Sequence, residues 1–363
     1  MITIEEKLNL YLQWFLVTDF KKTLTIIFFV LFSTNVTFAS VNDSIVLQDK
    51  TAKRLSEYGF FSDLVAQYPS KDVLPYELIS PLFSDYADKL RFIYMPSEGL
   101  AEYRPNEVFD FPEGTVLIKT FAYLNNHQKS NLNKQLLETR LLIKKNDEWK
   151  NVSYIWNEEQ SDAFLSVAGK TITTQFVNNE GDIQDVRYRV PNINQCKECH
   201  QLNKSIRPIG PKPRNLDKEF SYEDGVMNQL DKWHKQGWIK KDIKVKAMTD
   251  WTNTLASMNS RARSYLDINC GHCHIKGGSA DTTGLYLDFA ENREIHLGFY
   301  KKPIAAGRAS NNLKYSIVPG EPDSSILVYR MHSLDPGIMM PESGRALEHK
   351  EGTELIRKWI ENL

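Results

Sequence analysis

Cysteine is scarce in this sequence, and a strong excess of charge of either sign is missing. The chain has only four cysteines among 363 residues, and its formal net charge is −1. A near-neutral chain shows no electrostatic preference for nucleic acid or for an acidic membrane surface, so neither is expected as a partner. The apolar run from Leu24 to Phe32 is too short to cross a bilayer comfortably. No cysteine lies directly after that run, so we do not expect a lipoprotein anchor.

The four cysteines occur in two short motifs, and none is left over. The motifs read Cys196-Lys-Glu-Cys199-His200 and Cys270-Gly-His-Cys273-His274. Cys-x-x-Cys-His is the attachment signature of haem c. The two thiols bind the vinyl groups of the porphyrin, and the adjacent histidine supplies the proximal imidazole to iron. The sequence therefore predicts two covalent haem c groups.

Three other uses of Cys-x-x-Cys compete with haem attachment. A thioredoxin-like pair belongs in a strand–helix–strand unit, which the sequence does not indicate. A shared zinc ion would leave His200 and His274 unexplained. Two structural disulfides would suit an oxidising compartment.

Residues 1–40 read as a targeting segment. Lys21 and Lys22 precede the apolar run, and Thr37 to Ser40 provide small residues with a cleavage site after Ala39. If it is not cleaved, the segment would act as an N-terminal membrane anchor. We expect export to the periplasm, which agrees with haem c because bacteria attach this group outside the cytoplasm.

The remaining chain divides into three predicted domains. Residues 50–190 carry strand-like runs at Leu90–Tyr94, Thr115–Tyr123, Glu138–Lys144 and Trp149–Trp156, separated by turns such as Asn146-Asp147. We predict an antiparallel β domain here. A mostly α first haem segment would follow at 191–254, with a helix over Tyr222–Ile239, and then an all-α cytochrome c-like domain at 255–363. The predicted fold class is α+β multidomain.

The last domain has the clearest pattern. Apolar residues at helical spacing lead into Cys270, Asp323 or Ser324 can cap a short helix through Tyr329, and an amphipathic helix ends the chain. Between these two helices lies the loop Asp335–Pro341. This order resembles a class I cytochrome c domain.

The loop suggests the sixth iron ligand of the second haem. Met340 directly precedes Pro341 in it, and thioether ligation raises the potential of haem iron. We favour Met340 over Met339, and rank His332 and His349 below both.

The sixth ligand of the first haem is harder to assign. We choose Met227, with His234 next and with Met248, Met258 and the Met95-Pro96 pair as further candidates; an open site is the remaining reading. His272 is expected to face solvent, and Arg308 is a candidate partner for a haem propionate.

The chain also resembles a largely uncharacterised family of diheme c-type cytochromes of Gram-negative bacteria. The matching stretches are Leu55–Phe61, Pro75–Leu78, Pro81–Tyr86, Phe111–Thr120, Glu138–Leu142, Asn194–Cys196, Pro208–Pro211, Arg261–Asp267, Val318–Gly320 and Gly337–Pro341. The resemblance implies two covalent haems and electron transfer with a periplasmic or membrane redox partner protein. The alternative is a diheme enzyme, a peroxidase or small-molecule dehydrogenase, with an open iron at the first haem.

Overall fold

Contacts within the chain group Ala39–Leu363 into one compact unit. In the computed structural model, the described residues are 40–363 except 125–133, 179, 242 and 305. The three predicted domain ranges all fall within this one unit. Apart from Ser40, the predicted targeting segment lies outside the described residues. None of the described helices is long and apolar enough to span a bilayer.

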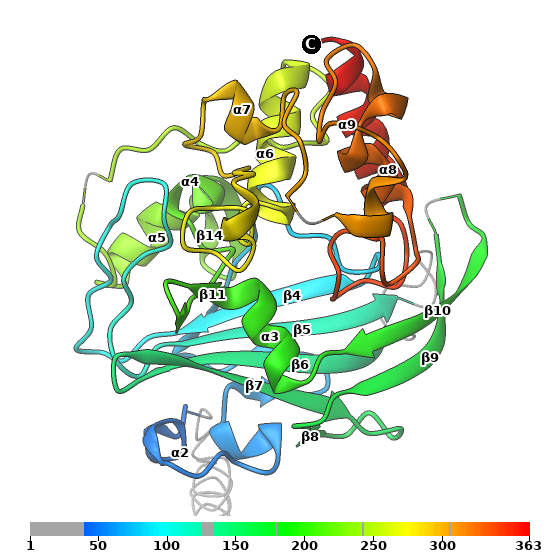
Figure 1. The fold of residues 1–363 in the computed structure, drawn as a ribbon. Helices are drawn as coiled ribbons and strands as arrows, with labels where there is room; N and C mark the ends of the chain where they lie inside the picture. Colours follow the sequence, from blue (N-terminus) through cyan, green and yellow to red (C-terminus); the bar gives the residue numbers. More distant parts are fainter. Residues whose placement is uncertain (1–39, 125–133, 179, 242, 305) are drawn as a thin grey trace, which may run out of the picture. The chain divides into compact units, whose positions relative to one another are not determined.

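A six-stranded antiparallel sheet forms the centre of the unit (Figure 1). Its strands follow chain order: β3 (Val73–Pro75), β4 (Asp88–Tyr94), β5 (Val116–Leu124), β6 (Lys134–Lys145), β7 (Glu148–Trp156) and β8 (Ala163–Leu165). The four strands expected from alternating apolar residues are present as β4 to β7. Asn146 and Asp147 join β6 to β7, and both have the positive φ that tight hairpins require.

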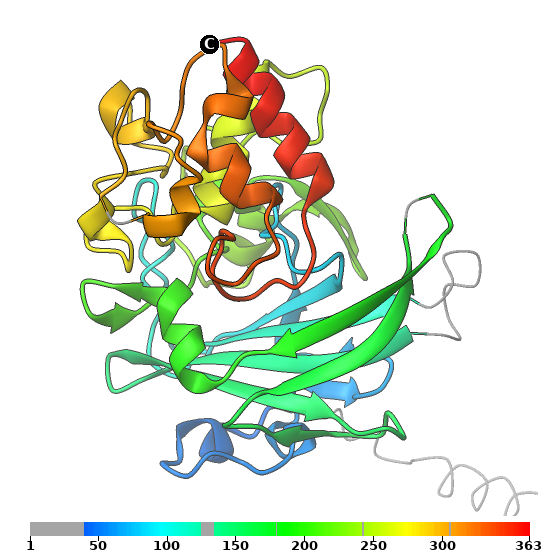
Figure 2. The ribbon, with the colours of Figure 1, turned by 45° about the vertical axis from the view of Figure 1, so that its right-hand side comes forward.

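The two faces of the sheet are covered by different parts of the chain. The N-terminal segment, which contains α2 (Asp43–Leu47) and the short 3-10 helix Leu55–Tyr58, packs on one face through Val46, Leu55 and Tyr58. The later part of the chain covers the other face (Figures 1 and 2). Trp149 there joins a core with Trp233, and Phe121 joins another with Phe176 and Tyr188.

The other elements are short. They are β1 (Phe61–Asp63), β2 (Tyr68–Pro69), β9 (Lys170–Val177), β10 (Ile183–Val190), α3 (Ile193–His200), β11 (Gln201–Leu202), β12 (Ser205–Ile206), α4 (Pro213–Leu216), β13 (Glu219–Tyr222), β14 (Gly225–Asn228), α5 (Gln229–Lys235), α6 (Met258–Asn269), α7 (Glu294–Leu297), α8 (Ile326–His332) and α9 (Lys350–Glu361).

The predicted fold class is wrong. The protein is sheet-dominated, with 24% helix and five helices of seven or more residues, and no all-α C-terminal cytochrome c-like domain is evident among the described residues. The segment 191–254 is not mostly α either. Its predicted helix over Tyr222–Ile239 is instead the β13–β14 hairpin followed by the short helix α5.

The C-terminal helices fail to form a separate domain because they pack against the irregular segment before β4. The Phe83 amide donates to the side chain of Asn269 in α6 at 2.8 Å, and the buried carboxylate of Asp85 accepts from the amides of Ala346 and Leu347. Helical periodicity identified α8 and α9 individually. It carried no information about these contacts across more than 180 residues.

Helices α6 and α9 pack against each other at Gly352, where the lack of a side chain leaves room for the ring of Tyr265. Gly352 lies in the first turn of α9, and a Cβ added there would overlap the phenol ring of Tyr265. We expect Gly352→Ala to lower the free energy of unfolding by about 1–3 kcal/mol, because overpacking outweighs the gain in helix propensity of up to ~1 kcal/mol. Urea denaturation measures the change. The exposed Glu354→Ala is the control, and a Gly352→Ala variant as stable as the parent protein would contradict the prediction.

Candidate cofactor site

The first Cys-x-x-Cys-His motif lies on α3. Asn192 caps this helix by accepting from the amides of Asn194 and Gln195, both at 3.0 Å. Asparagine is a preferred N-cap residue, so the sequence itself fixes where the helix begins. Spacings of three and four residues then put Cys196, Cys199 and His200 on one helix face.

The second motif begins where α6 ends. The amides of Cys270 and Gly271 both donate to the carbonyl of Leu266, at 2.9 and 2.8 Å, and the chain then turns sharply through His274. Gly271 is needed in this turn, because a Cβ there would approach the Asp267 carbonyl and the Asp288 backbone too closely. The turn brings the second motif alongside the first.

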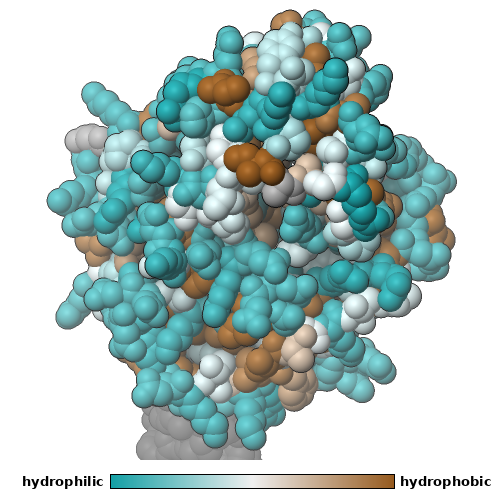
Figure 3. Space-filling view, in the orientation of Figure 1, coloured by the Kyte–Doolittle hydropathy of each residue, from teal (hydrophilic) through white to brown (hydrophobic). Residues whose placement is uncertain are grey.

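Both motifs open into one cavity of about 680 Å³ between the sheet and the helical part of the chain. Its walls are mostly apolar, and they include Leu117 of β5, Ile268 of α6 and Leu327 of α8. Such a volume lies within the range of ligand sites. The surrounding surface is largely hydrophilic and is hollowed near the centre of the face in Figure 3.

The two motif histidines are arranged alike. His200 Nδ1 lies 2.7 Å from the carbonyl of Arg207, and His274 Nδ1 lies 3.3 Å from that of Leu285. This contact places the proton on Nδ1 and leaves the lone pair of Nε2 in each ring free to bind a metal, which is how metal-binding imidazoles are commonly oriented. Burial lowers the pKa of His200 to about 3 and that of His274 to about 4, so both rings are neutral. The donor set fits haem iron on both motifs.

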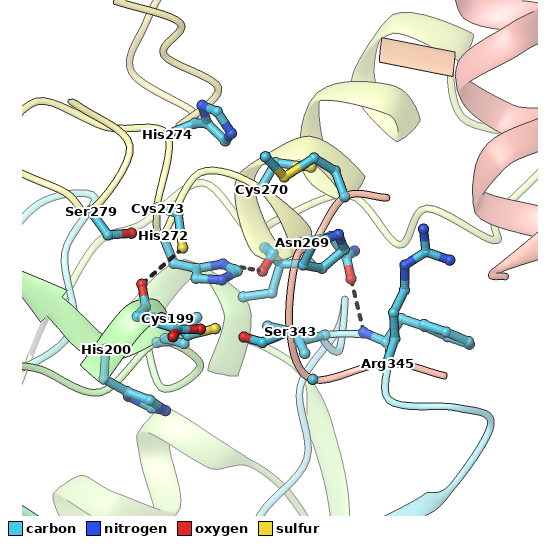
Figure 4. Close-up of a pocket in the computed structure, with 18 of the residues that line it drawn as sticks. Cys199, His200, Asn269, Cys270, His272, Cys273, His274, Ser279, Ser343 and Arg345 are labelled. Atoms are coloured by element: carbon cyan, nitrogen blue, oxygen red, sulfur yellow. Dashed lines mark hydrogen bonds between the residues drawn. The ribbon is translucent and has the colours of Figure 1, made fainter. Parts of the chain in front are cut away.

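The motifs touch through their second cysteines. Sγ of Cys199, Sγ of Cys273 and a ring nitrogen of His272 all lie within 4.8 Å of one another, and we call this group the sulfur–histidine cluster. Figure 4 shows it between His200 and His274. The expectation that His272 faces solvent is wrong, because its ring lines the cavity and Nδ1 lies 3.2 Å from the Ile268 carbonyl.

Met340 lines the same cavity as His274, whereas Met339 is buried in the protein core with 3% exposure. The loop that carries them is held firmly. The Arg345 guanidinium donates to the carbonyls of Met331 and Ser333, at 3.1 and 2.7 Å, and the Asp85 carboxylate binds the two amides that follow Arg345. Of the two methionines of this loop, Met340 is therefore the one that lies in the cavity of the motifs.

The residues predicted as sixth ligand of the first haem lie outside this cavity. Met227 sits in β14 opposite Phe220 and does not line the cavity. The cavity lining also lacks the other candidates, Met95, His234, Met248 and Met258. In the part of the chain that the structure describes, Met331 and Met340 are the methionines that line it. His349 also lines it, and its Nδ1 lies 3.0 Å from the Tyr265 hydroxyl, whereas His332 is exposed and contacts Glu348.

Sequence reasoning missed the basic side chains on the cavity floor. Lys89, Arg91, Lys119 and Arg140 project from β4, β5 and β6 into the cavity. The sequence does contain one signal for these side chains: Lys119 is a single charged residue within an otherwise apolar predicted strand. The predicted propionate partner Arg308 instead binds Asp335 at 2.9 Å and does not line the cavity.

Comparisons of the chain with models of known protein families, with curated proteins and with solved structures found no match.

Proposed function

We propose that this protein is an exported diheme c-type cytochrome that transfers electrons through two covalently bound haems. One observation carries the proposal: both Cys-x-x-Cys-His motifs open into a single cavity, with Sγ of Cys199 and Sγ of Cys273 within 4.8 Å. With haem attached at both motifs, Cys199 and Cys273 would each hold the edge of one porphyrin. The attachment points therefore favour direct electron exchange between the groups.

The residues of the chain have distinct tasks in this function. Cys196 and Cys199 would hold the first haem with His200 on iron, and Cys270 and Cys273 the second with His274 on iron. Haem iron supplies reversible one-electron chemistry. The protein orients each imidazole through its Nδ1 contact, excludes water with apolar walls, and offers Met340, whose thioether favours the reduced iron.

The wider setting belongs to the same proposal. The resemblance to diheme cytochromes of Gram-negative bacteria and the targeting pattern of residues 1–40 support a periplasmic location. Electrons would pass to or from a soluble or membrane-bound redox partner protein. The near-neutral charge of the chain gives no reason to expect nucleic acid.

Haem and metal content of the purified protein test the proposal. We expect two covalent haems per chain in an alkaline pyridine spectrum. A bound metal ion at the sulfur–histidine cluster is the competing use of these thiols. His272→Ala separates the two, because it removes a metal ligand but neither cysteine of the attachment motif. Two haems in both the parent protein and His272→Ala support the proposal, whereas a haem-free protein that loses zinc with His272→Ala overturns it.

Replacement of Met340 by alanine should abolish the methionine-to-iron charge-transfer band of one haem and lower its potential. The reason is that Met340 is the methionine of the loop that faces the cavity. Met339→Ala is the matched control: it should keep the band and lose about 2–5 kcal/mol of stability, as buried methionines do. An unchanged band in Met340→Ala would exclude this ligand.

A diheme enzyme is the second candidate, and one observation favours it. None of the methionines chosen for the first iron lines the cavity, so an open site there would suit peroxide or a small substrate. Electron paramagnetic resonance decides between the two. Two low-spin irons support a carrier, and a high-spin iron that binds cyanide supports an enzyme.

A further inference from the structure

The floor of the cavity carries three cations in a row across neighbouring strands. Arg91 of β4 is paired with Lys119 of β5, and Lys119 with Arg140 of β6. We call these residues the basic row. Ser153 of β7 continues it, and all four side chains line the cavity. Like charges directly opposite each other destabilise a sheet, so the row needs a compensating partner.

Among the described residues, an ion-pair partner is present at one end of the row. Arg140 forms an ion pair with Glu138, which is fully buried and also accepts from the Tyr188 hydroxyl at 2.6 Å. Within the described residues, Arg91 and Lys119 form no ion pair. Arg91 donates to the Lys89 carbonyl, and Lys89 in turn donates to the Leu82 carbonyl. Nε of Arg140 is buried without a partner.

Burial makes this excess of charge costly. Desolvation, with Arg140 and Arg91 nearby, lowers the pKa of Lys119 to about 7. Desolvation also lowers the pKa of Lys89 well below its usual value. Uncompensated charge of this kind is rare in proteins unless a ligand supplies the opposite sign. The four basic groups retain partial exposure because they face the cavity.

We propose that the basic row is a carboxylate-binding site, and that the carboxylates it holds are haem propionates. This inference rests on the proposed function. Guanidinium groups bind carboxylates through paired hydrogen bonds, and Lys119 between them adds a point charge. Each haem brings two propionates, and the row and both attachment motifs line the same cavity.

The test compares three variants of the holoprotein. Lys119→Met removes the central charge, Lys119→Arg keeps it, and Lys150→Met removes an exposed charge from β7 outside the cavity lining. A cation beside haem favours the reduced iron. We expect Lys119→Met to shift the ratio of reduced to oxidised iron about tenfold toward the oxidised form, a fall of about 59 mV for one electron. Lys119→Arg and Lys150→Met should keep the reduction potential of the parent protein.

A vibrational readout shows whether Lys119 touches a propionate. The propionate bending band in the resonance Raman spectrum should shift in Lys119→Met and stay in place in Lys150→Met. A lower potential with an unmoved band would mean that Lys119 acts from a distance and would overturn the assignment. An unchanged potential and band in Lys119→Met would also overturn it.

Added succinate separates bound propionates from a free carboxylate ligand. At constant ionic strength, succinate should leave the band and the potential of the parent protein unchanged, because the row is filled. A saturable shift that Lys119→Met abolishes would assign the row to a free carboxylate and overturn the propionate assignment. A parent protein without covalent haem would refute the proposed function instead, so the two failures are distinguishable.

Discussion

Replacing Cys270 and Cys273 together with alanine should lower the covalent haem content from two per chain to one. Each haem is expected to be bound by its own pair of thiols, and no other cysteine exists to take their place. The Cys196→Ala and Cys199→Ala pair should have the same effect. Haem staining after denaturing electrophoresis, together with a pyridine spectrum per mole of chain, measures the content.

The denaturing step matters because the two motifs share one cavity. A variant that lacks one haem can misfold. The other haem is covalently bound, so it stays on the chain even when the fold is lost. Two haems in either double variant would show that the motif is not the attachment site. His272→Ala, which changes the residue between the two cysteines of the second motif, is the control that should keep both.

Replacing Trp233 with alanine should lower the free energy of unfolding by about 3–5 kcal/mol. Trp233 is completely buried, and its ring centroid lies 5.7 Å from that of Phe109 and between 6.1 and 6.2 Å from those of Tyr76, Phe111 and Trp238. Loss of the indole would leave a void among four rings that cannot close in. Chemical denaturation of the holoprotein measures the change.

Two further substitutions show whether packing is the cause. The Trp233 indole nitrogen has no hydrogen-bond partner among the described residues, so Trp233→Phe removes volume without breaking a hydrogen bond and should cost less. Leu255→Ala changes an apolar side chain that is 95% exposed and should have almost no effect. A loss in Trp233→Ala no larger than that in Leu255→Ala would contradict this account.

Local pattern predicted the elements that depend on local interactions. Alternation located β4 to β7, and helical spacing located α9, with Leu355, Ile356 and Trp359 buried. The predicted helix over 222–239 is wrong because its first part is a β-hairpin. Glu223 and Asp224 form the turn between β13 and β14, and Gly225, the first residue of β14, has a φ of 119°. The helix begins only after Asn228, whose side chain accepts from the amide of Leu230.

Pattern could not predict which surfaces meet. The cysteines of both motifs were identified from spacing alone, but their contact depends on how two distant segments pack on the sheet. Lys119 reads in the sequence as an interruption of an apolar strand. It becomes informative only when the register sets Arg91 and Arg140 beside it.

The loop of Met340 has a consequence for how quickly electrons could move. Its two ends are tied by buried charged groups, Arg345 on one side and Asp85 on the other. A side chain carried by such a loop moves little when the charge facing it changes. Little movement means a small reorganisation free energy, which speeds electron exchange at a given driving force. In the proposed diheme protein we expect the second haem to exchange electrons faster with a partner, because none of the methionines named for the first haem lines the cavity that both motifs share.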